Sequence, residues 1–130
     1  MLKLPPHFRR EVERLGQEGI DDWGPLAALS DARLRQLAAS GSASEQRLVR
    51  LRGQARLVVE AELAPEEAAL LLHAGIATSQ GLAEASAERL VVQLGRLERS
   101  LLGGTTPAID RAKVQRWIAN ARRRSGRPGN

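Results

Sequence analysis

The sequence has no cysteine, no tyrosine, one phenylalanine and two tryptophans among its 130 residues. Without cysteine there is neither a disulfide framework nor a thiolate-held zinc or iron–sulfur site. So few aromatic residues disfavour a β-sandwich, in which aromatic and β-branched side chains are enriched. Hydrophobic residues still make up 42% of the chain, which is enough for a core of packed helices. The composition therefore predicts an all-α protein.

Long apolar runs are also absent. The longest, such as Ala68–Leu72, are far too short to span a bilayer. The segment Met1–Pro6 lacks the apolar core of a secretory signal. We therefore expect no membrane association and a cytoplasmic location.

Catalytic patterns are lacking as well. The two histidines, His7 and His73, stand at no metal-ligand spacing and beside no nucleophile. The pair Gly103-Gly104 is not followed by the lysine of a phosphate-binding loop. The sequence predicts a protein that is not an enzyme and that holds no metal and no cofactor.

Lysine is scarce, and arginine supplies 18 of the 20 basic residues. Arginine suits phosphate and carboxylate recognition, but a GC-rich genome produces the same excess. The distribution of charge is more informative. Residues 57–88 contain six acids and no Lys or Arg, whereas residues 111–130 contain seven basic residues and no acid. This basic C-terminal segment indicates either a polyanionic partner or a solvated basic surface.

An internal repeat organises the chain. When the sequence is aligned with itself so that Leu15 falls on Leu71, the first half matches the second in a pattern of Leu, Gly-Ile, Leu-Ala, Ser and Arg-Leu. The matched pairs are Leu15/Leu71, Gly19/Gly75, Ile20/Ile76, Leu26/Leu82, Ala27/Ala83, Ser30/Ser86, Arg33/Arg89 and Leu34/Leu90. We interpret this as a tandem duplication. The expected divisions are a first helical repeat over residues 4–63, a second over 64–124 and a flexible basic tail over 125–130.

Each copy is predicted to hold four helices. Prolines open the first helix of each copy, and Gly19 and Gly75 end it. A long helix is expected over about residues 44–63. Gly95 is expected to close the third helix of the second copy, and Pro107 to open the last helix. The expected N-caps are Asp21 or Asp22, Ser30, Thr78, Ser86 and Thr106. The expected core includes Leu15, Ile20, Leu34, Leu71, Ile76, Leu90 and Trp117.

A family resemblance emerges from the second copy. The segment Leu71–Thr78, followed by Leu82-Ala83 and Leu94-Gly95, resembles the helix-hairpin-helix superfamily. With Lys113–Ala121 added, the chain resembles more narrowly a helical family catalogued only as a domain of unknown function, related to helix-hairpin-helix proteins and usually in tandem. The resemblance covers residues 64–122 well and 5–63 weakly. It implies a tandem of helix-hairpin-helix-like four-helix units.

The resemblance also implies DNA binding without sequence preference, through glycine-rich hairpins whose backbone N–H groups approach phosphates. The matching segment of the second copy is Gln93–Glu98, where Gly95 fits the first glycine and Glu98 stands near the second and would repel a phosphate. In the first copy, Ala38–Ser42 keeps one glycine. Neither hairpin pattern is intact.

The last predicted helix offers a second route to nucleic acid. At about 100° per residue, Lys113, Arg116, Asn120 and Arg123 fall within about 80° of one another, away from the apolar stripe Val114, Trp117, Ile118 and Ala121. We expect this row to face solvent. The predicted nucleic-acid contacts are Lys113, Arg116, Asn120, Arg123 and Arg124, together with Arg96 of the second hairpin; an ordinary solvated surface is the alternative.

Two functional hypotheses follow. The first is a non-catalytic module that binds nucleic acid non-specifically through its basic C-terminal helix, which the charge cluster and the resemblance favour. The second is a protein–protein interaction adaptor with no nucleic-acid role, which the broken hairpins and the acidic span Glu60–Glu88 favour. The partner, the choice between DNA and RNA, and the oligomeric state stay open.

Overall fold

A computed structural model describes residues 2, 4, 6–102 and 109–125 of the chain. Over these residues the secondary structure is helical and contains no strand, as predicted: a 3-10 helix η1 (Pro6–Phe8), then α1 (Arg9–Gln17), α2 (Trp23–Ala27), α3 (Asp31–Ala38), α4 (Glu45–Glu60), α5 (Pro65–His73), α6 (Ser79–Ala83), α7 (Ala87–Leu102) and α8 (Arg111–Ser125). None of these helices has the length and apolar character needed to cross a membrane.

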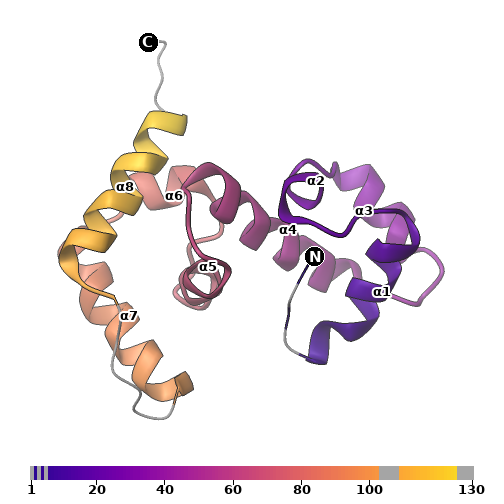
Figure 1. Ribbon diagram of the computed structural model, residues 1–130, viewed down its shortest axis with the longest axis horizontal. Coiled ribbons are helices and arrows are strands. Elements are labelled where there is room, and N and C mark those ends of the chain that lie inside the picture. Colours follow the sequence, from indigo (N-terminus) through magenta and orange to yellow (C-terminus); the bar gives the residue numbers. More distant parts are fainter. Residues whose placement is uncertain (1, 3, 5, 103–108, 126–130) are drawn as a thin grey trace.

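The helices form two groups joined by α4. In Figure 1, α1, α2 and α3 lie at one end, α5 to α8 lie at the other, and α4 runs between them. Each group surrounds its own hydrophobic cluster. The N-terminal cluster is Leu2, Phe8, Leu15, Ile20, Leu26, Leu34, Leu37, Ala43, Leu48, Leu51 and Ala55. The C-terminal cluster is Leu57, Ala61, Leu63, Ala68, Leu70, Leu71, Leu82, Leu90, Leu94, Ile109, Val114, Trp117, Ile118 and Ala121.

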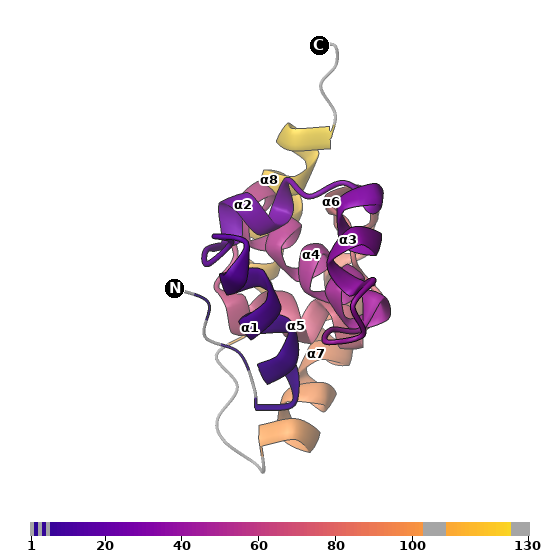
Figure 2. The same cartoon turned by 90° about the vertical axis from the view of Figure 1, so that its right-hand side faces the viewer.

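Helix α4 contributes to both clusters. It supplies Leu48, Leu51 and Ala55 to the N-terminal cluster, whereas Leu57, further along the helix, belongs to the C-terminal cluster. Figure 2, viewed from the N-terminal half, shows α8 extending above and α7 below the helices packed around α4. A single helix therefore couples the two cores mechanically, because it cannot unfold without exposing apolar side chains from both.

The helices of the second half follow those of the first in the same order. With Leu15 aligned to Leu71, helices α5, α6 and the start of α7 coincide with α1, α2 and α3. With the start of α4 at Glu45 aligned to the start of α8 at Arg111, these two helices coincide as well. Residues that fall on each other in these two alignments are here called matched.

The turns match too. Gly19 and Gly75 have φ of 77° and 89°, and the next residue in each case, Ile20 or Ile76, donates its N–H back to a leucine carbonyl at 2.9 and 2.8 Å. A positive φ is costly for any residue with a Cβ, so glycine ends both helices.

Side-chain caps start the helices where the sequence predicted them. Asp22, Ser30 and Thr78 each accept a backbone N–H from the first turn of α2, α3 and α6. Ser86 accepts the N–H of Arg89 in α7. These caps satisfy N–H groups that have no partner within the helix. The predicted cap Thr106 and Pro107 lie outside the described residues.

One predicted boundary is wrong. Gly95 does not close a helix, because α7 continues from Ala87 through Leu102. A glycine inside a helix costs only about 1 kcal/mol relative to alanine. Leu90 and Leu94 are buried on the same side of α7, and Leu97 packs against the same cluster, so burial outweighs that cost.

The predicted core is nearly all buried. Leu15, Ile20, Leu34, Leu71, Leu90 and Trp117 are buried, as expected. Ile76 is only half-buried at the edge of the C-terminal cluster, although the matched Ile20 is buried. The periodicity of the apolar residues thus identified the inward faces of the helices correctly.

Candidate nucleic-acid interface

Helix α8 carries most of the predicted contact residues, and it packs more deeply than its apolar stripe suggests. Val114, Trp117, Ile118 and Ala121 are buried, as the stripe predicts. Helix α8 lies against α6 and α7 and also touches α4. The buried face of α8 is therefore wider than the stripe of apolar residues, and it includes part of the predicted polar row.

Two members of that row do not face solvent. Asn120 is only 9% exposed and donates from Nδ2 to the carbonyl of Ala61 at 3.1 Å. Lys113 is half-buried, and its Nζ lies 3.2 Å from Oε2 of Glu67. The expectation of a solvent-facing row is thus wrong for these two residues, because α8 also faces α5 and the end of α4.

The remaining predicted residues are exposed. Arg123 bonds to Asn120, and its Nη2 lies 3.8 Å from Oε2 of Glu62, with 66% of the arginine side chain exposed. Arg116 and Arg124 are exposed, and within the described part of the chain their side chains have no hydrogen bond or ion pair. Arg96 is exposed in the same way, but it lies on α7.

The acidic and basic spans of the sequence meet in the fold. Three acids of the span 57–88 pair with three cations of α8: Glu62 with Arg123 at 3.8 Å, Glu67 with Lys113 at 3.2 Å and Glu88 with Arg111 at 3.4 Å. Intramolecular pairing therefore accounts for part of the basic C-terminal cluster. Sequence reasoning treated the two spans separately and missed this complementarity.

The hairpin of the N-terminal half is filled by the chain's own side chains. It lies between α3 and α4, where Gly41 has a φ of 82°. The carboxylate of Glu11, 1% exposed, accepts the N–H of Ser44 at 2.9 Å from the start of α4. Arg10 donates to the carbonyls of Gly41 and Ser42 on the same loop. A phosphate would have to displace Glu11, so the geometry does not favour phosphate binding at this hairpin.

Glu11 was not singled out from the sequence, although the repeat contained a signal for it. Glu11 is matched to Glu67, and Arg47 is matched to Lys113. Arg47 Nη1 lies 4.0 Å from Oε1 of Glu11, just as Lys113 pairs with Glu67. A carboxylate–cation pair thus joins the first and last helices of each half.

One further contact recurs at matched positions. Arg56 donates from Nε to Ala27 O at 3.2 Å, and Arg122 donates from Nε to Ala83 O at 3.0 Å. The matched amides of Gln54 and Asn120 are both buried, but they donate to carbonyls that are not matched, Pro65 O at 2.9 Å and Ala61 O at 3.1 Å. Helix α8 therefore shares with α4 the arginine contact and the carboxylate–cation pair.

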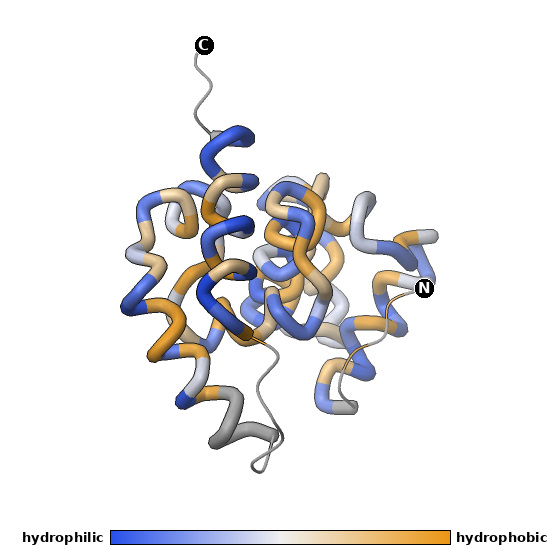
Figure 3. The backbone as a smooth tube through the Cα atoms, turned by 60° about the vertical axis from the view of Figure 1, so that its left-hand side comes forward, coloured by the Kyte–Doolittle hydropathy of each residue, from blue (hydrophilic) through white to orange (hydrophobic). Residues whose placement is uncertain are grey.

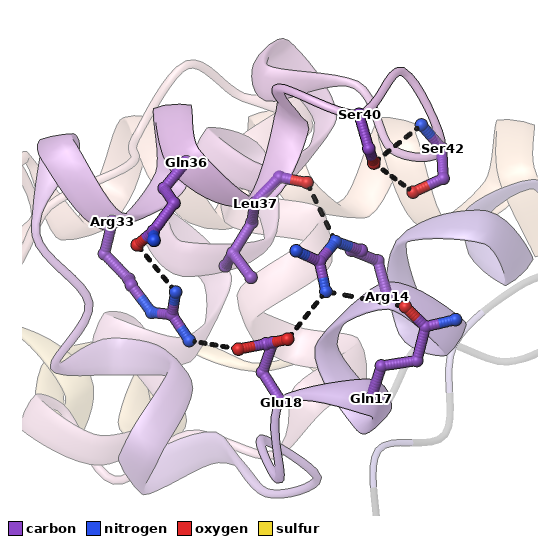
Figure 4. Close-up of polar contacts among 8 residues, drawn as sticks. All are labelled: Arg14, Gln17, Glu18, Arg33, Gln36, Leu37, Ser40 and Ser42. Carbon is purple, nitrogen blue, oxygen red and sulfur yellow. Dashed lines mark hydrogen bonds and ion pairs between the residues drawn. The ribbon is translucent and has the colours of Figure 1, made fainter.

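The N-terminal half carries an arginine-centred polar network that the C-terminal half lacks among its described residues (Figure 4). Glu18 accepts from Arg33 at 2.7 Å and from Arg14 at 2.9 Å, and Arg14 also donates to the carbonyl of Leu37 at 3.1 Å. The hydrogen bond from Arg33, followed by that from Arg14, holds the pKa of Glu18 below its usual value. Arg52 similarly lowers the pKa of Asp31, with which it forms an ion pair at 2.7 Å.

The described residues include no cluster of His, Asp or Glu arranged to hold a metal ion. One hollow of about 440 Å³ lies where the halves meet, lined by Ala27, Ala28, Arg56, Glu60, Thr78, Ser79 and Gln80. Another of about 550 Å³ lies along α7. In the first hollow the hydroxyl of Ser79 donates to Oε1 of Glu60 at 2.6 Å, and this bond joins α6 to the end of α4.

Comparison with known proteins places these features in one family. No curated protein and no solved structure matches the chain. The family model that matches is not a helix-hairpin-helix model, so the relationship of this chain to helix-hairpin-helix proteins stays a prediction. A family model described as a domain of unknown function (DUF4332) matches residues 5–124, and the chain belongs to that family.

Proposed function

We propose that the protein binds nucleic acid without sequence preference through the exposed arginines at the C-terminal end of α8, and that its halves are tandem copies of one helical unit. The recurrence of side-chain contacts at matched positions supports the tandem arrangement. The proposed phosphate-binding residues are Arg116, Arg123 and Arg124. Lys113 and Asn120 are left out of this set because most of each side chain is covered by the fold, whereas Arg123 is kept because its side chain is exposed beside its contacts with Asn120 and Glu62.

The observation that carries the nucleic-acid proposal is the difference between α4 and α8. In α4, the residue after the structural Arg56 is Leu57, which is fully buried against the C-terminal cluster. In α8, the residue after the matched Arg122 is Arg123, which is exposed. Helix α4 thus uses its C-terminal half to hold the next unit, whereas α8 presents arginines at the same place.

The surroundings of these arginines suit a polyanion. The end of α8 lies at the edge of the molecule, and its last turns are strongly hydrophilic (Figures 1 and 3). No acid occurs between Arg111 and Asn130, and among the described residues the carboxylate beside Arg123 is the exposed Glu62. Guanidinium groups bind phosphate oxygens in bidentate fashion and read no base identity from the backbone.

The test is the salt dependence of binding to short duplexes of unrelated sequence, measured by fluorescence anisotropy. With about three phosphates contacted, the plot of log K against log salt concentration should have a slope of about −2.7, and the Kd should be micromolar or weaker. The triple variant R116A/R123A/R124A should lose most of this slope while circular dichroism stays unchanged.

A matched control removes the same charge elsewhere. Arg9, Arg35 and Arg50 are exposed in the N-terminal half, and their side chains have no polar partner among the described residues. The variant R9A/R35A/R50A should retain the slope. Equal losses in the two triple variants would reduce the effect to net charge, and no binding by the intact protein at low salt would refute the proposal.

A further inference from the structure

The outer face of α7 is an exposed stripe that combines two arginines with an apolar residue. Arg89, Val92, Gln93 and Arg96, here called the α7 face, follow at spacings that place them on one side of the helix. All four are exposed, and Val92, at 54%, is the most exposed large hydrophobic residue of the described chain. The hollow of about 550 Å³ is lined by these residues and Glu88.

In the N-terminal half, the chain's own side chains bind the arginine at the matched position. Arg33, which is matched to Arg89, bonds to Glu18 Oε1 at 2.7 Å and to Gln36 Oε1 at 2.7 Å (Figure 4). In the second half, Ala74 stands in place of Glu18 and Val92 in place of Gln36. The arginine is kept, and both of its acceptors are replaced by apolar residues. The guanidinium of Arg89 accordingly has no polar partner within the described residues.

We infer that the α7 face docks an acidic amphipathic helix of a partner protein. A partner carboxylate supplies the acceptor that Glu18 supplies to Arg33, and a second carboxylate engages Arg96. These two arginines lie about two helical turns apart, which is about 10.5 Å along the helix. The partner helix therefore carries acids at the same two-turn spacing with an apolar side chain between them, which covers Val92.

The exposed valine decides the class of partner. A phosphate backbone would satisfy Arg89 and Arg96 but would leave Val92 in water. Protein interfaces combine arginine anchors with a desolvated apolar centre. The α7 face is also separate from the arginines at the end of α8, because the two helices extend in opposite directions from the place where they meet (Figures 1 and 2). The inference therefore does not depend on the nucleic-acid proposal.

The probe is a synthetic alanine-based helix of about 20 residues with Glu, Leu and Glu at positions 1, 4 and 8 of its central segment, matching the period of the α7 face. Its Kd and contact site are measured by amide chemical-shift changes in ¹⁵N-labelled full-length protein. We expect shifts concentrated at residues 88–97. R89E/R96E should weaken binding at least tenfold, about 1.4 kcal/mol, and should create binding to the same peptide with Lys in place of Glu.

Two controls keep the result specific. R35E/R50E makes the same change in charge at exposed arginines of the N-terminal half, and it should leave the affinity unchanged. V92A should weaken binding several-fold without loss of helix content, because it removes the apolar centre. The inference is overturned by an absence of shifts up to about 1 mM peptide, by shifts elsewhere, or by equal binding of the Lys peptide. Shifts of the α7 face caused by a DNA duplex and not by the peptide would also overturn it, since the occupant would then be nucleic acid.

Discussion

The two halves of the molecule share a helical plan but are held together by different forces. In the N-terminal half, ion pairs tie α1 to α3 and α3 to α4. At the matched positions Glu18, Asp31 and Arg52 are replaced by Ala74, Ala87 and Ile118, and Arg14, which also pairs with Glu18, is replaced by Leu70, whereas Arg33 is kept as Arg89. Among the described residues, the C-terminal cluster holds 14 buried residues against 11 in the N-terminal cluster. Because apolar burial contributes more than exposed ion pairs, the C-terminal half should be the more stable.

What the halves retain in common shows which contacts the plan requires. Both keep the glycine turn, the caps and the carboxylate–cation pair between first and last helices. These features fix backbone geometry or satisfy buried polar groups. The arginines of the ion pairs that differ also donate to backbone carbonyls, Arg14 to Leu37 and Arg52 to Leu29, and the matched residues Leu70 and Ile118 pack in the C-terminal cluster instead. Where the arginine is kept and only its acceptors differ, the guanidinium of Arg89 has no polar partner among the described residues.

The largest effects should come from core positions on α4 and α8. Trp117→Ala should cost about 3–5 kcal/mol and Leu51→Ala about 2–5 kcal/mol, because both side chains are fully buried. Urea unfolding followed by circular dichroism measures both. Since α4 belongs to both cores, each variant should still unfold in one transition. Two separated transitions would show that the halves are independent, contrary to the shared helix.

The next effect concerns the buried amides. Gln54→Ala and Asn120→Ala should each lower the free energy of unfolding by about 1–3 kcal/mol, because each leaves a carbonyl without its donor. Exposed glutamines on the same two helices provide controls. Gln46→Ala and Gln115→Ala should change stability by less than about 0.5 kcal/mol. If Asn120→Ala were as mild as Gln115→Ala, the buried position of Asn120 would be wrong.

Glycine substitutions should give smaller effects of opposite sign within one segment. Gly19→Ala and Gly75→Ala should each cost about 1–2 kcal/mol through backbone strain alone, since a Cβ at either site meets no atom within 4 Å. Gly16→Ala should instead stabilise the protein by about 0.5–1 kcal/mol, because Gly16 lies inside α1 and a Cβ there also meets no atom within 4 Å. Thermal unfolding midpoints distinguish the signs. A stabilising Gly75→Ala would contradict the left-handed turn.

The smallest expected effect is the loss of stability at acid pH, which should arise from the N-terminal half. Glu18 and Asp31 have lowered pKa values in the folded state, so their stabilising contribution is present above the unfolded pKa of about 4 and is lost as the pH falls through the folded value. Both lie in the N-terminal half. Urea midpoints at about pH 7 and about pH 3 should show a smaller acid sensitivity in R33A/R52A than in the unaltered protein. Equal sensitivity would mean that these pairs do not stabilise the fold.

Local features were readable from the sequence because they depend on residues close in the chain. The apolar periodicity identified the inward faces, and Gly19, Gly75, Ser30 and Thr78 marked helix ends, since turn glycines and caps act within a few residues. The match between the two halves of the sequence was visible over the first three helices of each half. The same alignment does not bring α4 onto α8, because α7 is longer than α3 and shifts every residue after it.

Other features were decided only by tertiary packing. The sequence predicts a helix end at Gly95, but α7 continues beyond it because Leu94 and Leu97 on either side pack against the C-terminal cluster. Asn120 and Lys113 read as surface residues on an isolated helix, but α4 and α5 lie against that side of α8. The acidic and basic spans neutralise each other in part, and Glu11 fills a hairpin that is distant in the chain.

By itself the sequence determined where the helices and their apolar faces lie, because those follow from local propensity and periodicity. Which charged side chains pair within the molecule was decided only by the fold. It depends on residues such as Glu67 and Lys113, which meet only when distant segments pack together.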